Sequence, residues 1–279
     1  NLSGNKYSLG TCLRVLKILI EEGVLIKDAA WDDQNKNYLD VLKFSFHKFS
    51  DHIIARYLLQ SFFDSRKVRA SLTAANSLGN IFSSDQNIFR NIDLVEALMV
   101  EFPERIKKNS KLTDRDLIDY LPKNLRTEPQ IMSCFIESLY WRKPENFLNN
   151  KGLIKKTIID YINKVLLRYD NSYRELLNLF VSTATKPFHP LNAERLSAYL
   201  KGFTMASRDS FWSEYLRKQY GSGSIYKLVS WIESQPLSKM MADQAACVIT
   251  VLAWTLGTNV KLLRNRATRA LYMVGKVHP

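Results

Sequence analysis

Residues 38–60 change their hydrophobic period halfway along, and the organisation of the chain follows from this stretch. Up to residue 46, the side chains alternate between two sets, as they do in a strand, where neighbouring residues point to opposite faces. Beyond that point, apolar side chains recur three and four positions apart, which predicts an amphipathic helix. These helical apolar positions are Phe46, Phe49, Ile53, Ile54, Tyr57 and Leu58. A strand that runs directly into a helix fits the end of a winged-helix module.

The residues before this stretch predict the preceding elements of the same module. A helix with an apolar stripe is expected to begin near a cap at Ser8 and to end at Gly23, a residue type that commonly follows a helix. The next elements are expected in this order: a strand at 24–26, a polar turn at 28–37 and a returning strand at 38–46. Helix, strand, loop and strand form the second half of a winged helix, so residues 1–60 are predicted to be a winged-helix-like module.

The tip of the wing would be the segment Asp32–Asn37. A wing that contacts DNA favours basic side chains at this place, because they neutralise phosphates. This wing carries Asp32 and Asp33 instead, which disfavours DNA binding by the module.

Beyond residue 60, apolar positions keep helical spacing and the breaks between helices are short. The later helices are expected at 151–168, 171–181, 190–201, 207–218, 222–234, 238–257 and 259–276. No strict repeat period is present, but paired helices with short loops favour a stacked α-solenoid over a bundle. The predicted fold is mainly α: a winged-helix remnant with a short β-hairpin, followed by an α-helical repeat arm at 61–279 that can divide again near 145–190.

Two local expectations concern the middle of the chain. Pro103 is expected to break the helix before it, because proline lacks the backbone N–H that continues a helix. A short helix is expected at 112–121, with Thr113 as its cap and acidic residues in its first turn, and Pro122 should stop it.

Composition excludes several classes of protein. The chain of 279 residues is 46% hydrophobic and 24% charged, with 10 Gly and 8 Pro, which is ordinary for a globular protein. No apolar run reaches the length of about 18–20 residues that a membrane span requires. The first residues resemble neither a signal peptide nor a natural start, so the chain is expected to be an internal piece of a longer protein. Three scattered cysteines, Cys12, Cys134 and Cys247, favour a reducing, cytoplasmic setting over a disulfide framework.

The formal net charge of +13 raises the question of a nucleic-acid partner. The basic residues are spread along the chain rather than gathered in one block, which favours solvated helix faces. Nucleic-acid binding nevertheless stays open as an alternative function.

The sequence carries no recognisable catalytic motif. There is no phosphate-binding P-loop, and the glycines at 221 and 223 lie between helices without a preceding strand. No serine-hydrolase or zinc-protease pattern occurs, and no Cys/His spacing suggests a metal site. This chain is therefore not expected to be an enzyme by itself, and no catalytic residue and no metal ligand is proposed from the sequence.

The segment from Phe44 to Asp51, followed by Ala55, resembles the motif that closes the winged-helix domain of STAND NTPases, including the NACHT group. The hallmark positions of that motif would be Phe46, Phe49, Asp51 and Ala55, which makes them the structural junction between wing and arm. In several such proteins a histidine at the first variable position of the motif touches the bound nucleotide. Here Phe46 holds that position, and His47, one residue away, is the candidate side chain near the nucleotide in the whole protein. Neighbouring residues of a strand point to opposite faces, so His47 would face away from the family's nucleotide-facing position.

Further segments extend the resemblance to the helical region of large bacterial antiviral STAND NTPases of the Avs type. They lie around 102–104, 120–122, 135–141, 189–195, 207–213 and 263–271. The resemblance implies ATP and Mg²⁺ in an upstream ATPase domain, a phage protein as ligand, self-association through the ATPase and activation of an effector. The charged and aromatic residues in these segments are candidates for contacts between helices or with a partner: Arg208, Asp209, Trp212, Arg264 and Arg266.

We therefore expect a regulatory, sensor-proximal part of an antiviral STAND NTPase that couples recognition of a phage protein to ATPase oligomerisation. Phe46 and Phe49 are expected to pack the strand and the helix together, with Asp51 in the first helical turn. Two other classes of function remain open, a nucleic-acid-binding winged-helix and helical-repeat protein and a purely structural interaction scaffold.

Overall fold

The computed structural model describes residues 9–32, 35–106, 114–166, 171–219 and 221–278. The chain is mainly helical, as predicted, and its only sheet in these ranges has two strands. The chain divides into two compact units, residues 1–101 and residues 102–279. The boundary predicted near residue 60 falls instead inside the first unit, because α2 packs on later helices of that unit.

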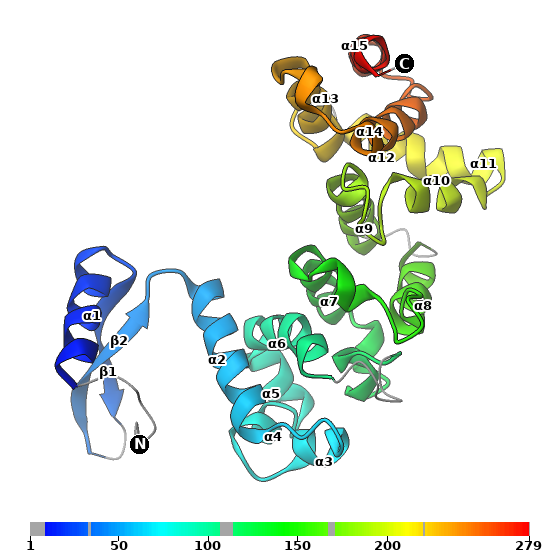
Figure 1. Cartoon of the computed structure of the whole chain (residues 1–279). Helices are drawn as coiled ribbons and strands as arrows, with labels where there is room; N and C mark the ends of the chain where they lie inside the picture. Colours follow the sequence, from blue (N-terminus) through cyan, green and yellow to red (C-terminus); the bar gives the residue numbers. More distant parts are fainter. Residues whose placement is uncertain (1–8, 33–34, 107–113, 167–170, 220, 279) are drawn as a thin grey trace. The chain divides into compact units, whose positions relative to one another are not determined.

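The described residues of unit 1 form a helix, a hairpin and then five helices (Figure 1). Its elements are α1 (Leu9–Glu21), β1 (Leu25–Asp32), β2 (Asn37–Phe44), α2 (His47–Phe62), α3 (Val68–Thr73), α4 (Ser77–Ile81), α5 (Asp85–Arg90) and α6 (Ile92–Arg105), of which the last runs across the boundary between the units. The expected order of helix, strand, loop, strand and helix is therefore observed at the start of the chain.

Gly23 ends α1 in the way that the sequence suggests. Its φ angle of 67° is in the left-handed region that glycine adopts without a steric penalty. The Val24 N–H donates to the Leu19 carbonyl at 2.9 Å, and the Gly23 N–H donates to the Ile20 carbonyl at 3.1 Å. These are the two hydrogen bonds of a Schellman motif, which satisfies carbonyl groups at the end of a helix.

The hairpin is longer than the sequence pattern indicated. β1 continues through residues 28–32, which we had expected to be a polar turn, and pairs with β2 from Leu25 opposite Phe44 to Asp32 opposite Asn37. Two side-chain contacts cross the strands in this part: an ion pair between Lys43 and Asp28, and an edge-to-face contact of Trp31 with Tyr38 at 5.1 Å. Such cross-strand pairs stabilise a two-stranded sheet, and they explain why charged residues occur within β1.

The helix α2 has two apolar faces. Ala55, Leu58 and Leu59 are buried in the core of unit 1, where α2 packs on α4. The opposite face carries a stripe of exposed apolar side chains with helical spacing, Phe46, Phe49, Ile53 and Tyr57. Only one of the two faces is therefore covered by the described residues of this chain.

Unit 2 consists of helices of varied length. The α-helices that follow α6 are α7 (Pro129–Trp141), α8 (Lys156–Leu166), α9 (Asn171–Ala184), α10 (Ala193–Lys201), α11 (Met205–Arg208), α12 (Glu214–Lys218), α13 (Ser224–Ser234), α14 (Ala242–Thr255) and α15 (Lys261–Val277). Short helices of other types lie between them: η1 (Leu117–Tyr120), η2 (Leu125–Thr127), η3 (Pro144–Phe147), η4 (Asp209–Ser213) and η5 (Leu237–Lys239), of which η4 is a π-helix and the others are 3-10 helices.

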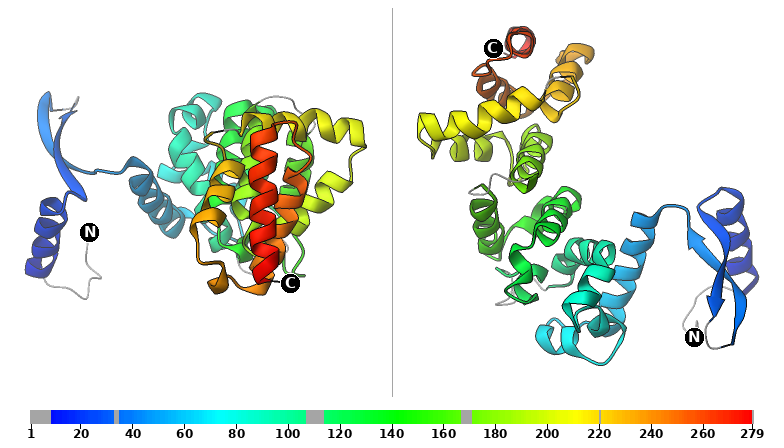
Figure 2. Two further views of the ribbon diagram at one scale, coloured as in Figure 1. Left: turned by 90° about the horizontal axis from the view of Figure 1, so that it is seen from above. Right: turned by 180° about the vertical axis from the view of Figure 1, so that it is seen from behind.

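The core of unit 2 is built around α9. This helix contacts α7, α8, α10, α13 and α14, and α14 in turn packs on α10 and α15 (Figure 2). Large side chains fill the interior, among them Phe135, Phe147, Phe180 and Tyr215, each almost fully buried. Burial of such side chains stabilises the helical unit, because each removes a large apolar area from water.

Two expectations about the middle of the chain are wrong. The helix α6 continues through Pro103 to Arg105, because a proline in the last turn removes only one hydrogen bond. Of the helix expected at 112–121, the structure describes residues 114–121, and in these the only helical element is the 3-10 turn η1, which Asp116 caps. The expected cap Thr113 lies outside the described residues.

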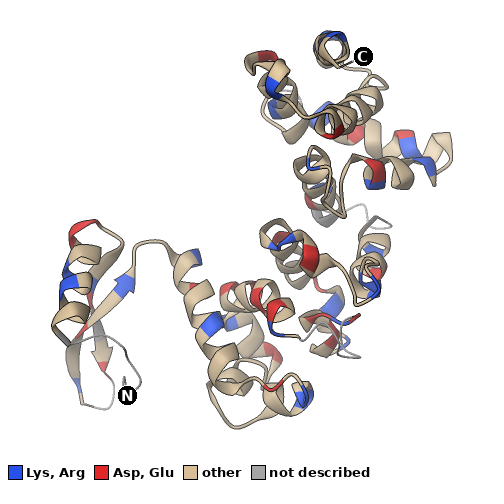
Figure 3. Cartoon of the chain, viewed as in Figure 1, with Lys and Arg blue, Asp and Glu red and all other residues tan. Residues whose placement is uncertain are grey.

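Basic and acidic residues both occur along the described helices of each unit. Figure 3 shows Lys and Arg on helices of both units, interspersed with Asp and Glu. Within the described ranges, no helix combines the length and the apolar character that crossing a membrane demands.

Candidate functional site

The junction between β2 and α2 differs from the expected arrangement. The strand ends at Phe44, and α2 begins at His47, so Phe46 is the cap residue and is 70% exposed. Phe49 is half exposed, but its ring contacts Phe44 edge to face at a centroid distance of 5.2 Å. The expectation that both rings pack strand and helix together is therefore wrong for Phe46, and Phe49 makes the contact without being buried.

The residues after Phe49 continue the junction along α2. His47 is the first residue of the helix α2 and does not belong to the strand. The prediction that it lies on the opposite strand face from Phe46 is therefore wrong. Asp51 lies in the second helical turn instead of the first, and Ala55 is completely buried. Burial raises the pKa of the Asp51 carboxyl group, and the nearby charge of Asp93 raises it further.

A buried carboxylate joins α2 to α6 in unit 1. The Glu101 side chain is only 4% exposed, and its two oxygens face two basic groups of α2. His52 Nδ1 lies 3.0 Å from one oxygen, and Arg56 Nε lies 2.9 Å from the other. Sequence analysis missed this cluster, although the spacing of His52 and Arg56, four positions apart, could have placed them on one helix face.

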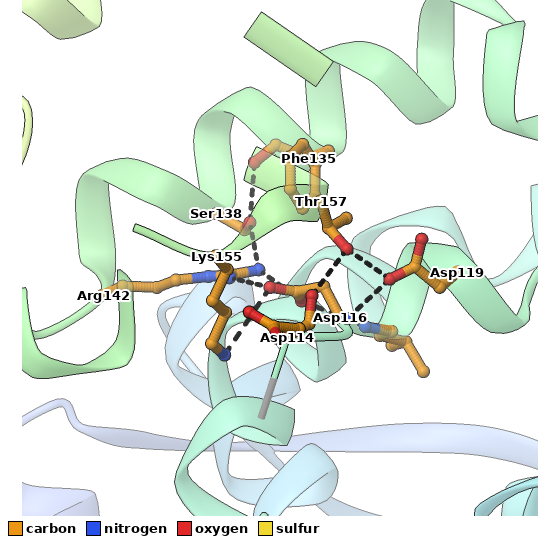
Figure 4. A network of polar contacts seen from close by, with 9 residues as sticks. Asp114, Asp116, Asp119, Phe135, Ser138, Arg142, Lys155 and Thr157 are labelled. Carbon is orange, nitrogen blue, oxygen red and sulfur yellow. Dashed lines mark hydrogen bonds and ion pairs between the residues drawn. The ribbon is translucent and has the colours of Figure 1, made fainter. Parts of the chain in front are cut away.

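A second buried ion pair lies in unit 2, between Asp116 and Arg142 (Figure 4). Both side chains have no exposed area, and the guanidinium group binds the carboxylate through two contacts, Nη1 to Oδ2 at 2.5 Å and Nη2 to Oδ1 at 3.0 Å. The same Nη2 donates to Ser138 Oγ at 3.1 Å, and the guanidinium lies over the Phe135 ring at 5.3 Å. The guanidinium group thus binds the carboxylate in a bidentate manner, which is the strong and geometrically specific form of an Arg–carboxylate pair.

The backbone around Asp116 is fixed by a capping box. The Asp116 N–H donates to Asp119 Oδ2 at 2.9 Å, and the Leu117 N–H donates to Asp116 Oδ1 at 3.0 Å. Thr157, at the start of α8, donates its hydroxyl to the same Asp119 oxygen at 2.5 Å. The cluster thus ties η1 to α7 and α8. An Asp at the cap with Asp119 three positions later is the one sequence signal that could have revealed it.

Lys155 lies beside this cluster and at the edge of a cavity. Its Nζ is 4.0 Å from Asp116 Oδ2, and the side chain is 5% exposed. The cavity has a volume of about 400 Å³ and is lined by Lys155, by residues at the end of α6, and by the segment from Glu145 to Gly152. Burial lowers the pKa of the Lys155 ammonium group, although the nearby aspartates oppose this shift.

The candidate residues near the end of the chain lie between helices. The Arg208 guanidinium lies over the Trp254 ring of α14 at 5.2 Å, and Trp212, 3% exposed, donates its Nε1–H to the Trp254 carbonyl at 3.0 Å. Asp209 is the first residue of the π-helix η4, which lies within a continuous run of helical residues from Met205 to Lys218.

The two arginines of α15 make different contacts. Arg266 pairs with Glu233 of α13, with Nη2 2.5 Å from Oε2, and lies over the Tyr226 ring at 4.4 Å. Arg264 is exposed and donates to the Thr258 carbonyl at 3.3 Å. Arg266 thus joins two helices, whereas most of Arg264 faces solvent.

The described residues contain no group of three or more His, Cys, Asp or Glu side chains placed to hold a metal ion. The ion pairs at Glu101 and Asp116 join helices, and neither contains a nucleophile next to a base. Comparisons of the chain with protein-family models, curated proteins and solved structures gave no match.

Proposed function

We propose that this chain is the regulatory part of an antiviral STAND NTPase, in which a winged-helix-like element contacts an ATPase domain and a helical arm of the solenoid type recognises a phage protein. The support from the sequence is the motif at Phe44–Asp51 with Ala55, together with the later segments that resemble Avs-type proteins. The support from the structure is the order of helix, hairpin and helix at the start of the chain, followed by further helices in the residues that the structure describes.

The observation that carries the proposal is the apolar surface of unit 1. More than half of the large hydrophobic side chains that are exposed in the described part of the chain lie between Leu13 and Tyr57. Trp31, Tyr38, Phe46 and Tyr57 are each more than half exposed. In the proposal, this concentration of exposed apolar side chains in one stretch of the chain marks a surface that another domain or protein covers. In the proposed function, that protein is the ATPase domain.

The mechanism would be a shift between closed and open states of the whole protein. Contacts of the junction with the ATPase domain would favour the closed state, and a ligand on the arm would favour the open state through its difference in affinity for the two. ATP and Mg²⁺ would bind outside this chain, with His47 as the side chain nearest to the nucleotide. The oligomer that activates the effector would form through the ATPase domain.

One observation of the gene and one measurement test this proposal. The reading frame upstream of Asn1 should encode a P-loop, and the chain alone should bind ATP–Mg²⁺ too weakly for calorimetry to detect at micromolar concentrations. A frame without a nucleotide-binding domain, or micromolar binding of ATP by this chain, would contradict the proposal.

A nucleic-acid partner is the second candidate, and the helix α15 favours it. The exposed face of α15 carries Lys261, Arg264, Arg269 and Lys276, and the helix contains no acidic residue. Cations spaced along one helix face can follow a phosphate backbone. If this candidate were right, duplex DNA would bind tightly at physiological salt; under the main proposal, binding is weak, independent of sequence and lost as salt rises.

A further inference from the structure

The Lys155 side chain is only 5% exposed, and its ammonium group has one ion-pair contact, at the long end of the distance range. Its Nζ makes no hydrogen bond to any residue in the described ranges, and the nearest carboxylate oxygen, Asp116 Oδ2, is 4.0 Å away. That oxygen already accepts from Arg142 at 2.5 Å. An ammonium group carries three donors, and burying it without acceptors is costly. The polar cluster therefore leaves donors of this ammonium group available to an acceptor outside the cluster.

The cavity beside Lys155 is the place from which such an acceptor can come. Its volume of about 400 Å³ is within the range of small-ligand pockets, about 300–1,000 Å³. Pro103 and Leu148 give it apolar walls, and Asn150 adds an amide group that can donate and accept. Apolar walls with a few polar groups are the usual composition of a binding pocket.

The charges around the cavity select the kind of acceptor. Glu104 and Glu145 both line the cavity, and Glu104 also pairs with Lys143 at 3.1 Å. Asp114, Asp116 and Asp119 lie near the Lys155 ammonium group, and Arg142 offsets the charge of Asp116, with which it pairs. An anionic ligand would be repelled by these carboxylates, so an uncharged oxygen such as an amide carbonyl suits Lys155 better. The two glutamates favour a cationic group in the same ligand.

We propose that this cavity binds a peptide segment of a protein partner, whose backbone carbonyl oxygen accepts a hydrogen bond from Lys155 and whose basic side chain lies near Glu104 and Glu145. A peptide combines both features, because every residue supplies a carbonyl oxygen and a Lys or Arg supplies the cation. This proposal rests on the protein-recognition role proposed above and gives that role a definite place in unit 2.

The test uses the whole chain with two capped tripeptides, acetyl-Gly-Arg-Gly-amide and acetyl-Gly-Glu-Gly-amide. Binding is followed by the amide chemical shifts of the isotope-labelled chain during titration. We expect saturable shifts at residues that line the cavity, with the Arg peptide binding more tightly than the Glu peptide. The Lys155→Met variant should bind the Arg peptide about tenfold more weakly, because a hydrogen bond from a charged group is lost.

Two further variants serve as controls. Lys156→Met removes an exposed lysine next in the sequence and should leave binding unchanged. Glu145→Gln changes an exposed residue, so it should fold normally and reduce the preference for the Arg peptide. This second variant keeps the proposal testable if Lys155→Met does not fold.

Several outcomes would overturn the proposal: no shifts at millimolar peptide, equal binding of both peptides, or equal binding by the wild type and Lys155→Met. None of these outcomes would bear on whether an upstream P-loop exists. Failure of the cavity and failure of the proposed function are therefore distinguishable.

Discussion

The start of unit 1 and the middle of unit 2 place polar and apolar side chains in opposite ways. From α1 to α2, many large apolar side chains are exposed, such as Tyr38 and Phe46. Around Asp116 and Arg142, by contrast, charged side chains are fully buried. Exposed apolar groups contribute little to the folding of the chain that carries them, whereas breaking a buried ion pair is costly. The first region is therefore suited to contacts with a partner, and the second to fixing the fold.

The largest effect is expected where the buried pair is broken. Asp116→Ala leaves the Arg142 guanidinium buried and without its carboxylate, which should lower the free energy of unfolding by about 3–5 kcal/mol. Urea unfolding followed by circular dichroism measures this change. Glu214→Ala removes the carboxylate that pairs with two solvent-accessible basic side chains, Arg217 and Lys218, and it should cause little change because surface ion pairs contribute little. If both variants lost the same free energy of unfolding, burial would not determine how much each ion pair contributes to stability.

Substitutions at the junction between β2 and α2 should lower the free energy of unfolding less. Because Phe49 is half exposed, Phe49→Ala should cost about 1–2 kcal/mol, below the range of about 3–5 kcal/mol for a fully buried ring. Phe46→Ala and His47→Ala should change the melting temperature much less, since Phe46 is 70% exposed and His47 only opens the helix. A large loss for Phe46→Ala in the isolated chain would mean that this face is covered within the chain.

A substitution of Lys155 is expected to stabilise the chain rather than destabilise it. Replacing this buried ammonium group with the side chain of Met should raise the free energy of unfolding by on the order of 1 kcal/mol at neutral pH, because the burial cost disappears. Thermal unfolding of Lys155→Met against Lys156→Met measures the effect. A marked loss of stability would instead assign Lys155 to the structural cluster of Asp116.

The smallest change in stability is expected for a substitution of Asp51, and it depends on pH. The pKa of Asp51 is raised in the folded chain, so the native state binds its proton more tightly than the unfolded state does. The contribution of Asp51 to stability is therefore fully present below its ordinary pKa of 3.8 and is lost as the pH rises through the raised value. Asp51→Asn should raise the melting temperature slightly at pH 7, and the gain should disappear near pH 3.5.

Local patterns predicted the helices better than the contacts between them. The end of α1 at Gly23 and most helices of unit 2 followed from periodicity and capping residues, which are properties of neighbouring positions. β1 was predicted too short because its stability comes partly from Lys43 and Tyr38 on the other strand. The pair of Asp116 and Arg142 joins residues 26 positions apart, and periodicity carries no information on such a contact.

In the proposed function, unit 1 regulates an ATPase through the junction between β2 and α2 in response to a protein ligand. The most direct test is ATP hydrolysis by the intact protein with and without a phage protein that triggers it, for the wild type and for Phe49→Ala. We predict that the ligand stimulates hydrolysis in the wild type and that Phe49→Ala, although folded, hydrolyses ATP without the ligand or not at all. Equal, ligand-controlled hydrolysis by both proteins would contradict the claim.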